Sequence, residues 1–364
     1  MTLQAIDELL AVPPFSFNPD ERDRLFLRAL NELTGLHWKM CSEYARAIDL
    51  LFPGKHAARK IDEVPYLPVG IFKSHALRSI DEKGIFKTLT SSGTTSSRVS
   101  RIVVDRETAA RQTRALAIIM GSILGPRRLP MIIVDSPNVI SDRRNFSARG
   151  AGILGMMNFG RDHFHALNDK MELDREGLRR FLDLHAKGPV LIFGFTFMVW
   201  RYFFKALKPE EVDLKTGILI HGGGWKKLGD EAITRSEFHR AFRDKTGLAR
   251  IHDYYGMVEQ VGSIYLECEE GFFHAPSFSD VLVRDPATWR EAAPGQQGVL
   301  QVLSALPTSY PGHSLLTEDL GAIVANDGCG CGRRGRHFVV HGRVPTAEPR
   351  GCSDTFVAPK AEAA

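Results

Sequence analysis

The sequence lacks a long apolar run and the pattern of a secretory signal. The apolar stretch from Val190 to Trp200 is too short to span a bilayer, and Arg201 closes it. The first residues, MTLQAIDELLAVPPFSF, carry acidic side chains and lack the apolar core of a signal peptide. We therefore expect a cytoplasmic protein without a membrane span.

Blocks of like charge are also missing. The 47 basic and 43 acidic side chains are scattered over 364 residues and give a formal net charge of +4. This distribution offers no basic arm for nucleic acid, whereas a mildly basic balance suits anionic small substrates. We predict no nucleic-acid partner.

Cysteine is scarce, with five residues in the chain. An odd number in a reducing compartment favours metal binding or thiol chemistry over disulfides. Hydrophobic residues are not scarce: they make up 43% of a chain long enough to bury a large core.

Helical and strand patterns occupy different parts of the chain. Apolar residues at spacings near three and four predict a helical N-terminal region, residues 1–84, packed on the core; they include Leu25, Leu27, Leu30, Leu33, Met40 and Tyr44. From residue 85 onward, short apolar runs alternate with helical stretches such as Arg106 to Ile123 and Asp174 to His185. The runs are RIVVD, PMIIVD, PVLIFGF, TGILIHGGG and QGVLQVLSALP.

This alternation predicts an α/β layered core over residues 85–343 with buried, largely parallel strands. A short tail, residues 344–364, follows it.

A hydroxyl-rich loop precedes the run RIVVD. It contains Thr90, Ser91, Ser92, Gly93, Thr94, Thr95 and Ser96. Backbone amides and hydroxyls of such a loop can donate to phosphate oxygens, and Arg98 and Arg101 add positive charge. Runs of this kind also mark exposed turns, and the lysine of a Walker loop is absent.

Two further segments could contact a flat ligand. Gly222, Gly223 and Gly224 follow an apolar run, where the absence of side chains permits close approach, although a tight turn has the same composition. In YYGMVEQ, Tyr255 and Gly256 precede Glu259. An aromatic ring can stack on a base and a carboxylate can bind magnesium, although a loop carboxylate is more often solvated.

Asp319 in SLLTEDLGAIV and Arg343 in VVHGRV complete the set. An aspartate can accept both hydroxyl protons of a ribose, and an arginine can donate to ribose or phosphate, although either can be a turn residue or a surface ion pair.

In order and spacing, these five motifs resemble the adenylate-forming superfamily of acyl-CoA synthetases, nonribosomal adenylation domains and luciferases. Within it the chain is most similar to the acyl-protein synthetases of the LuxE type and their phenylacetate-CoA ligase relatives, through LTSSGTTSS, YYGMVEQ, CGCGRRG and GRVPTAEPRGCSD. The resemblance implies an adenylate-forming N-terminal-type domain that uses ATP and magnesium.

The resemblance also assigns roles. It places Thr90 to Ser96 on the ATP phosphates and Gly222 to Gly224 with Tyr255 around the adenine. It assigns Glu259 to magnesium, Asp319 to the ribose hydroxyls and Arg343 to the ribose edge.

Two departures from the family pattern stand out. Val258 replaces the threonine of the Tyr-Gly-x-Thr-Glu motif. Only 21 residues follow Arg343, so we expect the usual C-terminal lid domain with its catalytic lysine to be lacking.

The residues permit attack of a carboxylate on the α-phosphorus of ATP, which needs positioning and charge neutralisation. The resemblance places the acyl acceptor at Cys352, beside Arg350, and also allows a partner protein such as a reductase, an acyltransferase or a carrier protein. The substrate expected is a fatty or aryl acid. The alternatives are an acyl- or aryl-CoA ligase and a degenerate nucleotide-binding protein.

The remaining cysteines indicate a structural metal. Cys268, His274, Cys329 and Cys331 provide three sulfurs and one imidazole, a set suited to tetrahedral zinc, although Cys-x-Cys is a tight spacing. The phenylacetate-CoA ligase relatives carry a similar arrangement. Free thiols with a surface histidine are the alternative.

Overall fold

The computed structural model describes residues 4–91, 99–141, 148–225 and 232–345. These residues form two compact units. The antiparallel unit comprises residues 4–91, 99–123 and 255–345, and the parallel unit comprises residues 124–141, 148–225 and 232–254. Every helix in the described ranges is too short or too polar to cross a membrane.

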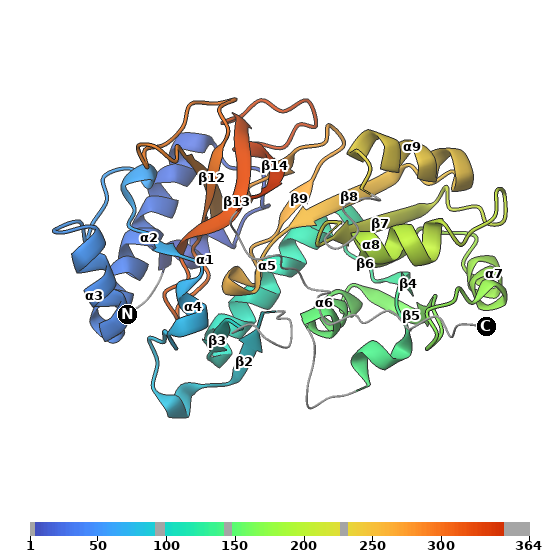
Figure 1. Ribbon diagram of the computed structural model, residues 1–364, viewed down its shortest axis with the longest axis horizontal. Coiled ribbons are helices and arrows are strands. Elements are labelled where there is room, and N and C mark those ends of the chain that lie inside the picture. The colour runs from blue at the N-terminus through green and yellow to red at the C-terminus, as the bar shows by residue number, and fades with distance from the viewer. Residues whose placement is uncertain (1–3, 92–98, 142–147, 226–231, 346–364) are drawn as a thin grey trace. The chain divides into compact units, whose positions relative to one another are not determined.

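The antiparallel unit begins with helices and ends with a sheet (Figure 1). Its helices are α1 (Gln4–Leu9), α2 (Pro19–Met40), α3 (Ser42–Leu51), α4 (Ile71–Ser74) and α5 (Arg106–Leu124), with short 3-10 turns η1 (Ile61–Glu63), η2 (Glu82–Gly84) and η6 (Val258–Gln260). Its strands are β1 (Leu67–Pro68), β2 (Lys87–Thr90), β3 (Arg101–Val104), β9 (Tyr265–Glu267), β10 (Phe273–His274), β11 (Ser279–Arg284), β12 (Gly298–Ser304), β13 (Ser314–Ala325) and β14 (His337–Arg343).

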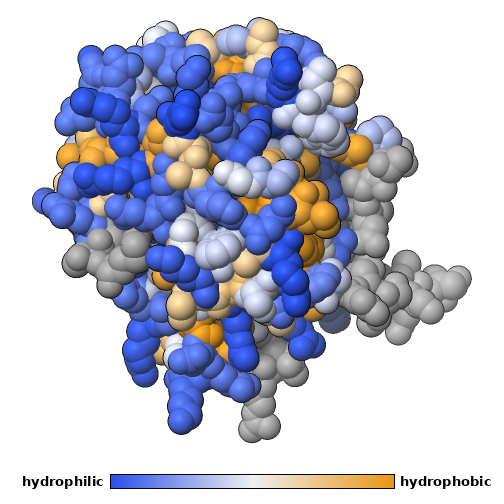
Figure 2. All heavy atoms as spheres, turned by 90° about the vertical axis from the view of Figure 1, so that its left-hand side faces the viewer, coloured by the Kyte–Doolittle hydropathy of each residue, from blue (hydrophilic) through white to orange (hydrophobic). Residues whose placement is uncertain are grey.

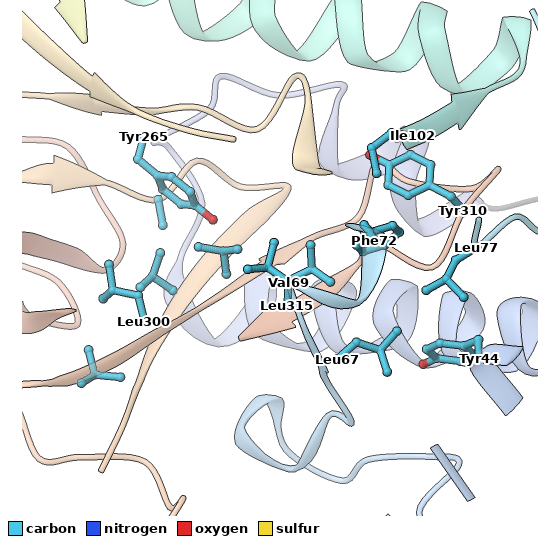
Figure 3. Close-up of a cluster of buried hydrophobic side chains, with 14 of the residues drawn as sticks. Tyr44, Leu67, Val69, Phe72, Leu77, Ile102, Tyr265, Leu300, Tyr310 and Leu315 are labelled. Carbon is cyan, nitrogen blue, oxygen red and sulfur yellow. The ribbon is translucent and has the colours of Figure 1, made fainter. Parts of the chain in front are cut away.

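The sheet of this unit has the order β11-β12-β13-β14-β10-β9, with every pairing antiparallel. Strand β1 adds to β13 in parallel, and β2 with β3 forms a separate antiparallel pair. Buried side chains from the helices and strands form one core, in which Phe72 meets Tyr310 edge-on with ring centroids 6.1 Å apart (Figure 3).

The parallel unit consists of β4 (Leu129–Ile133), η3 (Pro137–Ile140), α6 (Ala148–Met157), β5 (Gly160–His165), α7 (Arg175–Leu184), β6 (Val190–Phe195), α8 (Thr196–Met198), η4 (Val199–Phe204), β7 (Gly217–Gly222), α9 (Arg235–Thr246) and β8 (Arg250–Tyr255). The strand order is β8-β7-β6-β4-β5, all parallel. Every residue of β6 and β7 is buried, which explains why their sequences are apolar apart from His221.

Local sequence signals account for several element ends. Asn18 caps α2 by accepting from the Asp20 amide, and Pro19 occupies the first turn, where its missing N–H costs nothing. Helix α9 begins with a capping box between Thr234 and Glu237 and ends at Gly247 with a φ of 74°.

The predicted α/β class is confirmed, and the two expected helices are present as α5 and α7. The prediction of largely parallel strands is correct for PMIIVD, PVLIFGF and TGILIHGGG. It is wrong for RIVVD and QGVLQVLSALP, which form the antiparallel strands β3 and β12. Apolar runs show that a strand is buried, and only the partner strand decides its direction.

Candidate active site

Two of the predicted nucleotide contacts face each other on neighbouring strands. Asp319 on β13 is the register partner of Arg343 on β14. The Arg343 Nε atom lies 3.5 Å from Asp319 Oδ1, and its Nη2 atom donates to Glu318 Oε2 at 2.6 Å. The antiparallel pairing therefore brings together an aspartate and an arginine that are 24 positions apart in the sequence.

Tyr255 joins this pair from the end of β8. Its hydroxyl donates to Asp319 Oδ2 at 2.7 Å. Burial raises the pKa of Tyr255 well above its ordinary value, so the phenol keeps its proton and remains a donor. Burial also raises the pKa of Asp319. The carboxylate is thus held by Tyr255 at one oxygen and by Arg343 at the other.

Glu259 lies in the 3-10 turn η6 and is 5% exposed. Tyr310 fixes the turn because its hydroxyl donates to the Glu259 carbonyl oxygen at 3.0 Å. The next side chain, Gln260, donates to the carbonyl oxygens of Val302 and Gly312. Burial raises the pKa of the Glu259 carboxyl, with Glu318 adding to the rise and Arg343 opposing it. A nearby cation would favour the charged form of this buried carboxylate.

At the base of the hydroxyl-rich loop, the ends of β2 and β3 are held together by hydrogen bonds. Thr90 pairs with Arg101 at the end of β2 and β3. Ser91 and Ser100 then exchange bonds, since the Ser91 amide donates to the Ser100 carbonyl at 3.1 Å and the Ser100 amide donates to Ser91 Oγ at 2.9 Å. The Ser100 hydroxyl is close enough to lower the pKa of Glu259 in part. Ser92, Gly93, Thr94, Thr95 and Ser96 lie outside the described residues.

The glycine turn belongs to the parallel unit. Gly222 is the last residue of β7, and Gly223 and Gly224 have φ angles of 83° and 65°. A Cβ atom on Gly222 would lie 2.6 Å from the Tyr254 ring, which is its register partner on β8. Close packing against Tyr254 therefore requires glycine at Gly222, and the left-handed backbone favours glycine at Gly223 and Gly224. The motif YYGMVEQ predicts a role for Tyr255, whereas its neighbour Tyr254 gave no sequence signal of this contact.

The four predicted zinc ligands gather in the antiparallel unit. One ligand atom from each of Cys268, His274, Cys329 and Cys331 lies within 4.8 Å of all the others. Cys268 Sγ is 3.9 Å from Cys329 Sγ, and Cys331 Sγ is 3.4 Å from His274 Nε2. Zinc–sulfur bonds of about 2.3 Å in a tetrahedron place two sulfurs about 3.8 Å apart. The spacing of these side chains therefore fits a tetrahedral ion.

Several residues of these sites gave no clear sequence signal. Glu318 on β13 contacts Arg343, Tyr310 in the loop between β12 and β13 contacts Glu259, and Thr196 at the start of α8 contacts the glycine turn. Cys352 lies outside the described residues.

Comparison with known proteins gives one family and a set of related folds. The family model described as acyl-protein synthetase, LuxE, matches residues 2–359. The long-chain-fatty-acid–luciferin-component ligase of Aliivibrio fischeri is 26% identical over 276 residues, which cover 72% of this chain and 70% of the relative. The ligase of the same name from Vibrio harveyi is 23% identical over 383 residues, covering 96% and 92%.

Among solved structures, a 2-hydroxyisobutyryl-CoA ligase in an open conformation, bound to 2-HIB-AMP and CoA, has a TM-score of 0.68 at 18% identity. The match covers 92% of this chain and 77% of the ligase. The same ligase in its postadenylation state has a TM-score of 0.65 at 18% identity, covering 91% and 69%. At this identity the likeness shows the fold, a mixed α/β fold with a large sheet.

Proposed function

This chain belongs to the LuxE acyl-protein synthetase family, and from that membership we propose that it activates a long-chain fatty acid with ATP and passes the acyl group to a thiol. The substrate class is supported by the names of two relatives, both long-chain-fatty-acid ligases. The main structural support for a nucleotide site is the carboxylate of Asp319, which Tyr255 contacts at one oxygen and Arg343 at the other.

The proposed first step is adenylation. An oxygen of the fatty-acid carboxylate bonds to the α-phosphorus of ATP, the bond from that phosphorus to the bridging oxygen breaks, and pyrophosphate leaves. Asp319 accepts from the ribose hydroxyls while Arg343 donates to the ribose edge. Because charge spreads over the phosphate oxygens, positioning and neutralisation supply most of the acceleration.

Magnesium fits the carboxylate of Glu259. This side chain is buried and has a raised pKa, so a divalent cation beside it would offset the cost of its charge. When bound, the ion would neutralise negative charge on the phosphates. The fixed 3-10 turn would hold the carboxylate in one place.

The proposed second step transfers the acyl group. A thiolate bonds to the acyl carbon, the bond from that carbon to the phosphate oxygen breaks, and AMP leaves. We assign the thiol to Cys352, in the tail sequence RGCSD beside Arg350. A reductase, an acyltransferase or a carrier protein would then take the acyl group onward.

Exchange of labelled pyrophosphate into ATP tests the adenylation. Fatty acids of increasing length should support exchange, and aryl and amino acids should not. Glu259→Gln should slow exchange on the order of a hundredfold, because several kcal/mol of charge stabilisation are lost. Glu176→Gln, an exposed carboxylate on α7, is the matched control. Failure of the wild-type protein with every acid would overturn the proposal.

Covalent labelling tests the acceptor. Incubation with radiolabelled fatty acid and ATP should give a hydroxylamine-labile label on the protein, and Cys352→Ser should abolish it while exchange continues. Cys41→Ser, a buried cysteine on the antiparallel unit, should keep the label. Coenzyme A that stimulates AMP release, with the thioester found on the small molecule, would instead identify an acyl-CoA ligase.

We also propose that Cys268, His274, Cys329 and Cys331 bind a structural zinc ion. The support is the mutual spacing of their ligand atoms and the donor set of three sulfurs and one imidazole. Metal analysis of the purified protein should find about one zinc per chain. Cys329→Ser should lose the metal and lower the melting temperature; a stable, zinc-free wild-type protein would contradict the assignment.

A further inference from the structure

The carbonyl at the start of the glycine turn accepts a hydrogen bond from the first residue of α8, which directly follows the neighbouring strand β6. Thr196 follows β6 and is 4% exposed, and its Oγ1 donates to the Gly222 carbonyl oxygen at 3.1 Å. The preceding residue, Phe195, is the register partner of Gly222. A threonine directly after one parallel strand thus fixes the last peptide of the next.

A second bond continues this chain of contacts. Thr196 Oγ1 lies 3.0 Å from His221 Nδ1. A hydroxyl has one proton, and the Gly222 carbonyl can only accept, so the hydroxyl proton goes to the carbonyl. The His221 Nδ1 atom must then carry a proton and donate to Thr196.

The protonation state of His221 agrees with this assignment. Burial lowers the pKa of the imidazole to about 3, so the ring is neutral near pH 7 and carries a single proton. The Asp253 Oδ1 atom lies 3.7 Å from Nδ1, beyond hydrogen-bond distance, so Thr196 is the nearer acceptor for that proton. The order of donation is therefore His221 to Thr196 to Gly222.

Tyr254 restrains the same residue from the opposite strand. A Cβ atom on Gly222 would lie only 2.6 Å from the Tyr254 ring. The end of β7 is thus held between Thr196, which follows β6, and Tyr254 on β8. Beyond it, Gly223 and Gly224 have no side chains to fix their backbone, and both have positive φ. The conformation of the turn depends on how its first peptide is held.

We propose that Thr196 and His221 are positioning residues for the nucleotide: they fix the peptide after Gly222 so that the glycine turn presents its backbone to the ligand. This inference rests on the proposed function and on the family resemblance, which assigns Gly222 to Gly224 to the adenine of ATP. Neither side chain has to touch the nucleotide. Their effect should fall on nucleotide binding, with the fatty-acid site unchanged.

The principal test compares Thr196→Val with Thr196→Ser. Valine keeps the shape and removes both hydrogen bonds, whereas serine restores the hydroxyl. We expect Thr196→Val to weaken ATP binding, measured by calorimetry without fatty acid, by about tenfold, the loss of roughly one net hydrogen bond. Thr196→Ser should stay within about twofold of wild type. The KM for ATP should rise in parallel, with the KM for fatty acid unchanged.

The matched control is Thr246→Val. Thr246 is a threonine of similar burial in the same unit, and its hydroxyl donates to the Phe242 carbonyl oxygen within α9. This variant should lose comparable stability and keep its ATP affinity. Equal ATP affinities for wild type and a folded Thr196→Val would overturn the inference, as would an equal loss in Thr246→Val.

Two substitutions of His221 test the same inference if Thr196→Val does not fold. His221→Asn keeps a donor near the Nδ1 position, whereas His221→Gln moves it toward the Nε2 position. We expect Asn to preserve ATP affinity and Gln to lower it severalfold, and the reverse order would contradict the proton assignment. Absence of ATP binding by the wild-type protein would refute the proposed function itself, which separates the two failures.

Discussion

At the scale of single residues, the proposed nucleotide site depends on one carboxylate and the groups that orient it. Asp319 meets Arg343 because the two are register partners, and it meets Tyr255 through a 2.7 Å hydrogen bond. An aspartate held at both oxygens keeps one orientation before the ligand arrives, which lowers the entropy lost on binding. We therefore expect Tyr255 to contribute to nucleotide binding through its hydroxyl as well as through its ring.

The change Tyr255→Phe isolates that hydroxyl. We expect the KM for ATP in the exchange assay to rise about tenfold, because one charge-assisted hydrogen bond to Asp319 is lost. Tyr265→Phe is the control: it is the same change at a buried tyrosine whose hydroxyl donates to the Asp280 carbonyl oxygen at 2.8 Å. An unaltered KM in Tyr255→Phe would show that Asp319 needs no such support.

At the scale of elements, helix α9 comes after the glycine turn in the sequence and packs on η4 through Phe238 and Phe242. Both side chains are buried, and their rings contact Trp200 and Phe204 respectively. The capping box at Thr234 satisfies amides at the start of the helix. The sequence TRSE contains this signal directly.

Loss of the cap should destabilise the parallel unit. Thr234→Ala should lower the free energy of unfolding by about 1 kcal/mol, because the hydroxyl no longer accepts from the Glu237 amide. Thr234→Ser keeps the acceptor and should stay close to wild type. Urea denaturation followed by circular dichroism measures the difference, and equal midpoints for Ala and Ser would contradict the role of the cap.

At the scale of the whole molecule, one face of the protein is largely hydrophilic (Figure 2), whereas the interior contains histidines that burial keeps neutral. The face drawn in Figure 2 is mostly hydrophilic, with hydrophobic side chains in small separate groups. In the interior of the antiparallel unit, His37 and His313 stack with ring centroids 5.1 Å apart. Burial lowers the pKa of His37 to about 3 and that of His313 well below its ordinary value.

These buried histidines predict loss of stability in acid. The unfolded chain binds a proton at each histidine near pH 6.5, while the folded chain does so only near pH 3 at His37. Below pH 6.5 the unfolded state therefore gains protons, and the free energy of unfolding falls as pH falls. Urea midpoints between pH 7.5 and 4.5 should decrease steadily.

A substitution identifies the contribution of His37. His37→Gln should reduce the slope of unfolding free energy against pH by up to about 1.4 kcal/mol per pH unit, the effect of one proton. His75→Gln, at an exposed histidine, should leave the slope as it is. An unchanged slope in His37→Gln would mean that other groups account for the acid sensitivity.

The amino-acid sequence by itself determined the acyl-protein synthetase family and the α/β class. The family model over residues 2–359 confirms the family, and the large sheet with its helices confirms the class. Motifs such as YYGMVEQ are local, so their residue types and spacing can be recognised without knowledge of the fold. Helix ends and buried strands can likewise be predicted locally, because capping residues and apolar periodicity occur within short consecutive segments.

Only the tertiary structure decided which distant residues meet. The register of β13 and β14 pairs Asp319 with Arg343, and the parallel order of β6, β7 and β8 places Thr196 and Tyr254 on either side of Gly222. No local pattern contains this information, because strand direction and pairing depend on the packing of the whole sheet. The same holds for the proposed zinc ligands, which come together only through the folding of β9, β10 and the loop before β14.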